Sequence, residues 1–190
     1  KVRRGYNNEK ITLLDETVKK VNKTFLLITD NSKALGIAGI MGGQHSGISA
    51  DTENIVLESA CFNHKTIMGR SRILNLHTES GLRFERGVDP LIQKHALERA
   101  TQLINEYSDG QNGPISIKQD DESIPPKQPI MLRKKRIHQI LGITIANYKV
   151  YEILTKLDMR VVEQEYGYSG WLVTPPSFRF DINEECDLIE

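Results

Sequence analysis

The sequence is poor in cysteine, in long apolar runs and in excess charge, and each shortage excludes a class of protein. Its two cysteines, Cys61 and Cys186, have no CxxC partner, which excludes a disulfide framework and a zinc finger. No apolar stretch approaches the ~20 residues that span a bilayer, and the basic residues 1–4 lead into no signal-peptide core. We therefore expect a cytoplasmic chain without a membrane partner.

The charge balance is even, with 25 Lys and Arg against 25 Asp and Glu. An even balance argues against a protein whose whole surface attracts nucleic acid, although it leaves local basic patches open. With 38% hydrophobic and 26% charged residues, the composition is that of an ordered globular chain, and 190 residues fit one large domain or two small ones. The chain begins without Met and stops inside an expected amphipathic helix, so we expect a fragment of a longer polypeptide.

Several catalytic signatures are also missing. There is no GxGxxG that opens a helix and no GxxxxGK[ST], so the two common phosphate-binding loops are excluded. There is no GxSxG and no HExxH, and Cys61 has no evident histidine partner. A hydrolase built on one of these motifs is therefore not indicated.

The hydrophobic pattern predicts an α+β fold with a mixed or antiparallel sheet and packed helices. Short apolar runs bounded by turn residues indicate strands at 25–29, 34–41 and 54–59. Residues 67–74 suit a short helix, and the spacing of apolar residues predicts a long helix over 90–107. For that long helix, Asp89 provides an N-cap and Pro90 occupies the first turn.

The second part of the chain reads as a separate small domain. A stretch rich in Pro, Gly and acidic residues predicts a boundary that divides the chain into 1–123 and 124–190. Beyond it, the pattern predicts a small α+β domain of helix-turn-helix-like appearance. Its expected elements are a strand at 130–132, helices at 133–141 and 147–157, and strands at 160–165 and 171–174. By periodicity alone, a DNA-binding module is an open alternative here.

Four stretches of the first part carry residues that could do chemistry. Gly42 and Gly43 let the backbone approach a ligand or adopt positive φ, although a bulge or turn is the commoner reading. Glu58 ends an expected apolar strand, where a carboxylate is costly unless it meets a donor. Residues 77–80 gather an imidazole, two hydroxyls and a carboxylate, and 83–87 place arginines around a phenylalanine. The former could equally be a capped turn, and the latter more often pairs internally than with phosphate.

Two charged stretches belong to the second part. Residues 133–136 open an expected helix with four cations, for which a solvated face is the default interpretation. Asp181, Asp187 and Glu190 lie at spacings of six and three, so three carboxylates could converge on Mg²⁺ or Ca²⁺ if a helix follows Asp181. An acidic helix start that only complements the helix dipole is the simpler explanation.

Read together, these stretches resemble the beta chain of bacterial phenylalanyl-tRNA synthetase in their order and spacing over essentially the whole length. The strings that carry the resemblance are Gly39-Ile40-Met41-Gly42-Gly43, His45-Ser46-Gly47, Val56-Leu57-Glu58-Ser59-Ala60, Leu76-His77-Thr78-Glu79-Ser80, Arg83-Phe84-Glu85-Arg86-Gly87-Val88-Asp89-Pro90, Pro175-Pro176-Ser177-Phe178-Arg179-Phe180-Asp181 and Asp187-Leu188-Ile189-Glu190. Each string is weak alone, but the joint match is specific.

The resemblance implies that residues 1–123 are the C-terminal part of an editing domain that hydrolyses tyrosine wrongly attached to tRNA(Phe). It assigns the editing pocket to Gly42, Glu58, Thr78 and Ser80, with Glu58 reading the tyrosine hydroxyl and Thr78 orienting the attacking water. An analogue that lacks the hydroxyl leaves a buried acceptor unpaired, at a cost of ~1–3 kcal/mol. Many members of the family have alanine at Ser80, and the family's pocket also uses residues upstream of Lys1. We therefore expect weak or no editing by these 190 residues alone.

For the second domain, the resemblance implies an architectural role and a magnesium site shared with the alpha chain, with Asp181, Asp187 and Glu190 as ligands. The family's fourth carboxylate would be residue 191. The complete enzyme is a ligase of two alpha and two beta chains that uses ATP, Mg²⁺ and tRNA(Phe). ATP and phenylalanine bind on the alpha chain, and no DNA partner is expected.

Two other functions stay open. One is a non-catalytic module that binds tRNA or another nucleic acid through Arg83, Arg86 and residues 133–136. The other is a scaffold whose only role is the interface with the alpha chain. Binding to phosphates weakens steeply as salt rises, so salt dependence distinguishes the first of them from an editing pocket.

Overall fold

A computed structural model describes residues 1–119, 127–164 and 169–190. The contacts divide the chain into two compact units, which we treat separately: unit 1 comprises Lys1–Val88 and Ile92–Ile115, and unit 2 comprises Asp89–Leu91 and Ser116–Glu190. The expected boundary between residues 123 and 124 lies outside the described residues. No helix in the described part is long and apolar enough to cross a membrane.

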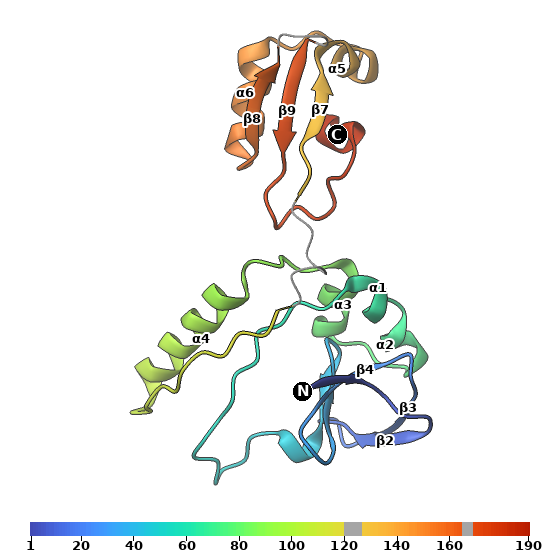
Figure 1. The fold of residues 1–190 in the computed structure, drawn as a ribbon, viewed down its shortest axis with the longest axis vertical. Coiled ribbons are helices and arrows are strands. Elements are labelled where there is room, and N and C mark those ends of the chain that lie inside the picture. Colours follow the sequence, from blue (N-terminus) through green and yellow to red (C-terminus); the bar gives the residue numbers. More distant parts are fainter. Residues whose placement is uncertain (120–126, 165–168) are drawn as a thin grey trace. The chain divides into compact units, whose positions relative to one another are not determined.

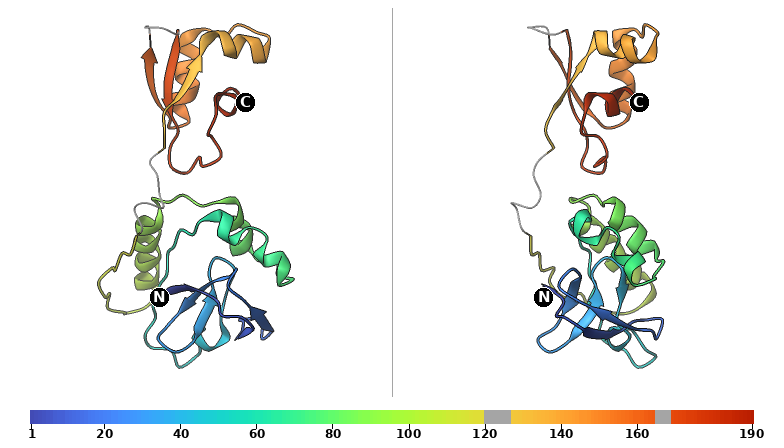
Figure 2. Two further views of the ribbon diagram at one scale, coloured as in Figure 1. Left: turned by 45° about the vertical axis from the view of Figure 1, so that its right-hand side comes forward. Right: turned by 90° about the vertical axis from the view of Figure 1, so that its right-hand side faces the viewer.

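Unit 1 combines short antiparallel strands with four helices (Figures 1 and 2). Its elements are β1 Val2–Arg4, β2 Glu9–Thr12, β3 Val18–Val21, β4 Leu26–Thr29, β5 Ala34–Ile37, β6 Met41–Gly42, the 3₁₀ turn η1 Gln44–Ser46, α1 His64–Ile67, α2 Arg70–Ile73, α3 Glu79–Arg86 and α4 Gln93–Tyr107. One sheet has the order β1-β4-β5-β6, and β2 pairs with β3 as a hairpin. The α+β fold predicted from the sequence is confirmed.

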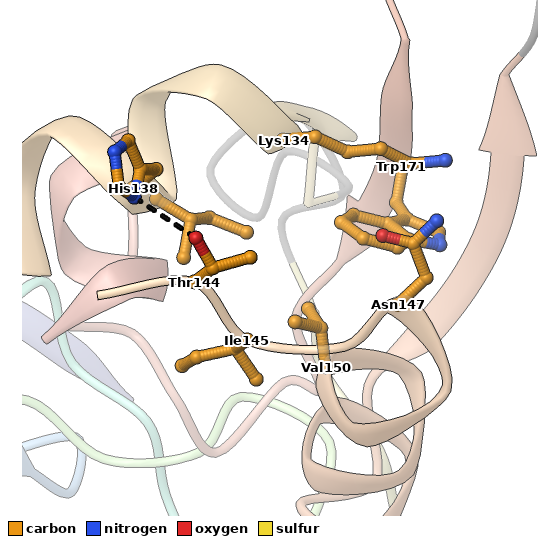
Figure 3. A pocket seen from close by; sticks show the side chains of 8 residues that line it. Lys134, His138, Thr144, Ile145, Asn147, Val150 and Trp171 are labelled. Atoms are coloured by element: carbon orange, nitrogen blue, oxygen red, sulfur yellow. Dashed lines mark hydrogen bonds between the residues drawn. The ribbon is translucent and has the colours of Figure 1, made fainter.

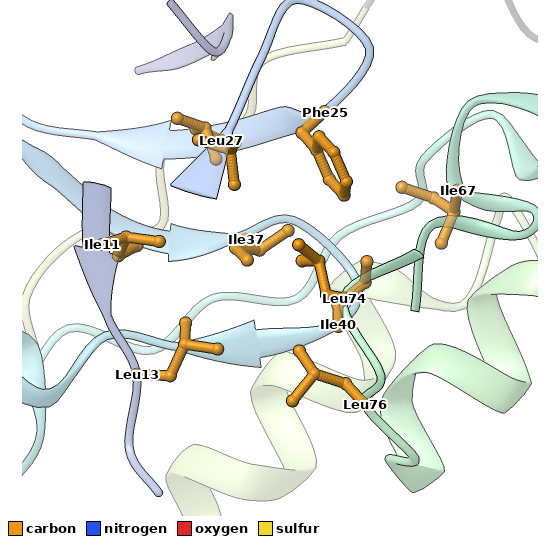
Figure 4. Packing of buried hydrophobic residues seen from close by; sticks show 10 residues of the cluster. Ile11, Leu13, Phe25, Leu27, Ile37, Ile40, Ile67, Leu74 and Leu76 are labelled. Atoms are coloured by element: carbon orange, nitrogen blue, oxygen red, sulfur yellow. The ribbon is translucent and has the colours of Figure 1, made fainter. Parts of the chain in front are cut away.

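The core of unit 1 lies where strand residues meet the segment that carries α1 and α2. Phe25, Leu27 and Ile37 project from the strands toward Ile67 and Leu74, as Figure 4 shows. A large apolar side chain contributes about 1.5–3 kcal/mol when it is fully buried, so this cluster is the main source of stability in unit 1. None of the core residues belongs to α4, in which every side chain retains some exposure to solvent.

Unit 2 is a three-stranded antiparallel sheet with helices packed on it (Figure 1). Its elements are β7 Ile130–Arg133, α5 Lys134–Leu141, α6 Asn147–Lys156, β8 Arg160–Gln164, β9 Gly170–Thr174 and α7 Glu185–Ile189, and the strand order is β7-β9-β8. Leu132, Trp171 and Val173 of the sheet pack with Val150 and Leu154 of α6 in a second core. The predicted elements of this part are confirmed, except that residue 165, the expected end of β8, lies outside the described residues.

Four predictions about unit 1 are wrong in detail. The single strand expected over 34–41 is two antiparallel strands, β5 and β6, because the chain turns at 38–40, where Gly39 has a left-handed φ of 67°. Residues 54–59 form no strand, because they make no hydrogen-bonded ladder with any strand of the described part. The single short helix over 67–74 is two helices, α1 and α2, since Gly69 between them adopts a left-handed φ of 75°. The long helix begins at Gln93, not at Pro90, because the Asp89 carboxylate accepts from the amide of Leu91 and closes a turn before the helix.

Helix α3 was not expected, although residues that start and stop it are visible in the sequence. The Thr78 hydroxyl caps it by accepting from the amide of Gly81 at 2.9 Å. Gly87 ends it with a φ of 113°, a conformation that glycine adopts without strain. The helix also holds the phenylalanine of the arginine-flanked string: Phe84 packs on Phe62 with ring centroids 5.3 Å apart. The Phe84 side chain therefore contributes to packing within unit 1.

The close pairing of β7 with β9 predicts a specific sensitivity in unit 2. A Cβ at Gly170 would overlap the carbonyl oxygen of Leu132 and lie 3.1 Å from the Cα of Arg133. Because both atoms belong to the backbone of the paired strand, Gly170→Ala should lower the free energy of unfolding by about 1–3 kcal/mol in denaturant titrations. As a control, Gly142→Asn should cost less, because the left-handed Gly142 lies in open space and asparagine tolerates that conformation. Equal losses in the two variants would contradict this account of the sheet.

Candidate functional site

The glycine string of unit 1 lies beside the strands β5 and β6. Gly42 pairs with Gly36 across the two strands, and a Cβ on Gly43 would lie 2.7 Å from the carbonyl oxygen of Leu35. Neither residue has a positive φ; the left-handed glycine of the string is Gly39, at 67°. The interpretation that Gly42 or Gly43 adopts positive φ is therefore wrong. The two glycines instead allow close approach between backbone segments.

Thr78 connects helix α3 to this glycine string. Its hydroxyl donates to the carbonyl oxygen of Ile40 at 2.9 Å while it caps the helix through the amide of Gly81. A hydroxyl has one proton to donate, and that proton is engaged here. The Thr78 hydroxyl therefore keeps one lone pair, with which it can accept a hydrogen bond from a ligand or a water molecule.

Ser80 and Glu58 are less tightly held. Ser80 lies in the first turn of α3 and is exposed. Glu58 lies in the extended segment 52–63, which has no regular secondary structure. In the part of the chain that the structure describes, the Glu58 carboxyl makes no hydrogen bond or ion pair. The structure thus ties Thr78 to the carbonyl of Ile40, two residues before Gly42, whereas no described bond joins Glu58 or Ser80 to Thr78 or Gly42.

The surroundings of Glu58 change its acidity. The residue keeps a large exposed surface, but the protein around the carboxyl removes enough solvent to raise the pKa of Glu58 above its usual range. Desolvation penalises the charged form, and the positive charge of the N-terminal ammonium of Lys1 offsets only part of that cost. Such a carboxyl is a strong acceptor for a hydrogen-bond donor brought by a ligand.

Most charged side chains of α2 and α3 pair with other groups of unit 1. Glu85 accepts from the amide of Gly69 at 3.2 Å and from the guanidinium of Arg72 at 3.1 Å, which joins the two helices. Arg83 forms an exposed pair with Glu79 at 3.7 Å, a kind of contact that contributes little to stability. Within the described residues, Arg86 has no ionic or hydrogen-bonded partner, so it remains available to an anionic ligand.

A second group of candidate residues surrounds an open depression in unit 2. Asp181, Asp187 and Glu190 line it together with Arg179. Arg179 engages both oxygens of Asp181: its Nε lies 2.9 Å from Oδ1, and its Nη2 lies 2.8 Å from Oδ2. This hydrogen bonding holds the pKa of Asp181 below its usual range.

The other two carboxylates of the depression differ in how they are held. Asp187 Oδ2 accepts from the amides of Asn183 and Glu184 at 2.8 and 2.9 Å, which caps α7 and lowers the pKa of Asp187. The Glu190 side chain has no partner among the described residues. Helix α7 itself is anchored to β7, since Glu185 accepts from the backbone amide of Arg133 at 2.8 Å and pairs with its guanidinium.

These carboxylates do not fit a magnesium ion as they stand. Mg²⁺ requires oxygen ligands in near-octahedral array at about 2.0–2.1 Å. Both Asp181 oxygens and one Asp187 oxygen already accept from N–H groups. Among residues 1–119, 127–164 and 169–190, no three acidic, imidazole or thiol groups are placed to hold a metal ion. The three expected ligands share a depression, but they do not form a closed site.

A small cavity that no sequence pattern indicated lies between α5, α6 and the sheet of unit 2 (Figure 3). Its volume is about 110 Å³, and its lining includes the apolar side chains of Ile137, Ile145 and Val150. At its rim, the ammonium of Lys134 lies 5.1 Å from the centre of the Trp171 ring. Lys134 also pairs with Glu163 at 3.1 Å, so this cation is engaged within the fold.

Comparison with known proteins gives two family matches. A model described as "B3/4 domain" matches residues 1–109, and one described as "tRNA synthetase B5 domain" matches residues 130–190. The chain is 48% identical over 189 residues to the phenylalanine–tRNA ligase beta subunit of Nitrosococcus oceani. The identity is 44% to that of Vibrio cholerae and 42% to that of Pseudomonas savastanoi. Each alignment covers 100% of this chain and 23–24% of the relative, so the chain spans about a quarter of their length. These matches confirm the family resemblance predicted from the sequence.

Two glutamates of unit 1 should respond oppositely to loss of their charge. Arg3 lowers the pKa of Glu9 through hydrogen bonds to its guanidinium at 2.6 and 2.9 Å, whereas desolvation raises the pKa of Glu58. Glu9→Gln should therefore lower the free energy of unfolding at pH 7 by about 1 kcal/mol. Glu58→Gln should leave it unchanged or raise it, because the cost of the desolvated charge disappears.

The pH dependence supplies the control. Stability due to Glu9 is present above the usual glutamate pKa and is lost as pH falls through the lowered pKa of the folded state. The cost due to Glu58 appears only as pH rises through its raised pKa, so wild type and Glu58→Gln should converge in acid. Thermal melts from pH 3 to 8 measure both. A Glu58→Gln variant less stable than wild type at pH 7 would mean that the carboxylate has a partner in the fold.

Proposed function

Since the chain belongs to the B3/4 domain family and continues into a tRNA synthetase B5 domain, we propose that it is part of the beta subunit of a phenylalanine–tRNA ligase. In this proposal, unit 1 carries part of a site that hydrolyses tyrosine wrongly attached to tRNA(Phe), and unit 2 is mainly architectural. The relatives that support it bear the name of that subunit and align with this chain from end to end. The division into residues 1–123 and 124–190 is part of the proposal.

The observation that carries the editing role is the unpaired carboxyl of Glu58. A carboxyl that is crowded enough to raise its pKa, and that no described donor satisfies, gains most from a ligand that brings a hydrogen-bond donor. The tyrosine side chain carries such a donor in its phenolic hydroxyl, and phenylalanine lacks it. Glu58 would thus stabilise tyrosine in the site and leave phenylalanine with an unpaired acceptor opposite its ring.

The other three residues would shape the same site. A Cβ at Gly42 would lie 3.2 Å from the Leu14 side chain and one at Gly43 would lie 2.7 Å from the Leu35 carbonyl oxygen, so both glycines would let this part of the site pack closely. Thr78 has an acceptor lone pair left, so an attacking water would donate a hydrogen bond to it and be oriented by it. Ser80 is exposed on the first turn of α3, where it would provide a further hydroxyl at the rim. We propose this water attack without a covalent nucleophile.

The partners follow from the same proposal. The complete ligase would contain two alpha and two beta subunits, act in the cytoplasm on tRNA(Phe), and use ATP and Mg²⁺ for the attachment of phenylalanine. Asp181, Asp187 and Glu190 would face the alpha subunit as magnesium ligands only in a different arrangement, because in the described arrangement they do not fit the ion.

The test is hydrolysis of tyrosyl-tRNA(Phe) by the complete two-chain ligase. Glu58→Ala should slow hydrolysis by about 10- to 100-fold, the loss expected when the acceptor for the substrate hydroxyl is removed, while charging with phenylalanine stays unchanged. Glu53→Ala is the matched control, because Glu53 is an exposed glutamate five residues earlier in the same segment. Unchanged hydrolysis by the Glu58 variant would leave Glu58 as a structural residue and remove the basis of the assignment.

The competing function is a module that only binds nucleic acid. Arg86 in unit 1 has no described partner, nor does Lys135 at the start of α5, whereas Arg136 acts electrostatically on Glu185. If binding to phosphates were the whole function, affinity for tRNA would fall steeply with salt and would not differ between tyrosyl and phenylalanyl forms. A difference between the two aminoacyl forms at constant salt supports the editing site instead.

A further inference from the structure

Two lysines lie directly opposite each other on the outward face of the β2–β3 hairpin (Figure 1). The register of the strands pairs Lys10 with Lys20, and both side chains are exposed. Side chains alternate between the two faces of a strand, and the neighbouring Ile11 and Val21 are buried in the core of unit 1. Like charges in directly opposite positions destabilise a pair of strands. Among the described residues, neither ammonium has an ion pair or a hydrogen bond that would offset this repulsion.

The acidic side chains of the hairpin do not face these lysines. Alternation places Glu9 on the inward face, where the Arg3 guanidinium engages it at 2.6 and 2.9 Å. Asp15 and Glu16 lie in the turn that joins the two strands, beyond two further rungs of the ladder. The outward face of the paired residues therefore carries positive charge and no acid.

Two more cations lie at the open end of the hairpin, where the chain enters β2 and leaves β3. Lys23 follows β3 by two residues and has no described partner. Arg4, at the end of β1, donates to the carbonyl oxygen of Thr24 at 3.4 Å, so its guanidinium lies beside the loop that carries Lys23. We call Arg4, Lys10, Lys20 and Lys23 the basic patch. Cations that are not paired within a fold are suited to bind the phosphates of a nucleic acid.

An exposed aromatic ring lies at the same end of the hairpin. Tyr6 belongs to the loop between β1 and β2, and the residue is 63% exposed. The Arg3 guanidinium lies 4.2 Å from the centre of its ring, and the backbone amide of Tyr6 donates to the Glu9 carboxylate at 2.8 Å. These contacts hold the ring and its loop in place before any ligand binds. An exposed ring beside a row of cations is the combination on which the bases of a single strand stack.

We propose that the basic patch and Tyr6 form a binding surface for a single-stranded segment of RNA. The four cations contact its phosphates, and one unpaired base stacks on the Tyr6 ring. A double helix fits this surface less well, because its bases are stacked on one another and cannot reach the ring. The choice of RNA rests on the proposed function, whose substrate is an aminoacyl-tRNA. The surface itself rests only on the residues of the hairpin and the loops beside it.

The experiment measures the binding of a fluorescein-labelled, unstructured RNA of about 12 nucleotides to the 190-residue chain by fluorescence anisotropy. Tyr6→Leu should weaken binding by about 5- to 50-fold, the loss expected when one base no longer stacks. Tyr6→Phe keeps the ring and should bind within about twofold of wild type. Tyr107→Leu is the matched control, because Tyr107 is also exposed and no described cation lies over its ring. A loss as large in the Tyr107 variant as in Tyr6→Leu would contradict the proposal.

The salt dependence tests the basic patch. Replacing both Lys10 and Lys20 by Ala should weaken binding at low salt and make the slope of log K against log salt less steep by about 1.4, the value for two phosphates of a single strand. The control replaces Lys33 and Lys94, two exposed lysines of unit 1 outside the patch, and should leave the slope unchanged. Lysines on exposed strands also prevent pairing with other chains. If that were their only role, the two double variants would bind RNA equally, which would overturn the proposal.

A duplex of the same RNA separates stacking from charge. Tyr6→Leu should not weaken binding to the duplex, and equal losses with both RNAs would refute the stacking role of Tyr6. None of these measurements uses aminoacylated RNA, so hydrolysis that does not depend on Glu58 would leave them unaffected. Conversely, a wild-type chain that binds no single-stranded RNA would overturn this surface and leave the Glu58 assignment intact.

Discussion

The carboxylates of this chain hold the structure together only where an N–H group reaches them, and this requirement organises both units. Glu9 ties β1 to β2 through Arg3, and Glu185 fixes α7 on β7 through Arg133. Asp187 caps α7 by accepting from two backbone amides. In such a position, a charge-assisted hydrogen bond compensates the carboxylate for the solvent that it loses on folding. Helix α7, which is only five residues long, depends on these contacts and on the packing of Leu188 and Ile189.

Glu58 and Asp181 are the two informative cases under this requirement. Glu58 is partly desolvated without a described donor, so its pKa rises and its acceptor capacity stays open to a ligand. Asp181 has a donor, Arg179, and its pKa falls. The first arrangement suits recognition of a hydroxyl group, whereas the second neutralises part of the charge of an acidic depression. Both roles follow from which donors the fold supplies.

The sequence predicted unit 2 better than unit 1 for a physical reason. In unit 2 the helices and strands follow one another with short turns, so local periodicity and the stop at Gly142 suffice to place α5, α6 and β9. In unit 1 the apolar run 54–59 has the composition of a strand, but strands exist only by pairing, and this run makes no ladder with any described strand. Periodicity within a segment carries no information about its neighbours.

The sites show the same division between what local sequence specifies and what contacts decide. The motif order identified Gly42, Glu58, Thr78 and Ser80 as a set, but among them the described hydrogen bonds tie only Thr78 to the glycine string, through the Ile40 carbonyl. The spacing of Asp181, Asp187 and Glu190 correctly indicated a shared surface. Nothing in the spacing indicated that Arg179, two residues before Asp181, would occupy both oxygens of that carboxylate.

Direct titration of individual carboxyl groups tests the central claim that donors decide the role of each carboxylate. Carbon-13 NMR of the chain labelled at its glutamate and aspartate carboxyls, followed from pH 2 to 8, reports the pKa of each group. The account predicts that Glu58 titrates above the usual glutamate range and Asp181 below the usual aspartate range. A Glu58 pKa below the usual range would mean that the fold already supplies its donor, and the proposed recognition of a ligand hydroxyl would lose its physical basis.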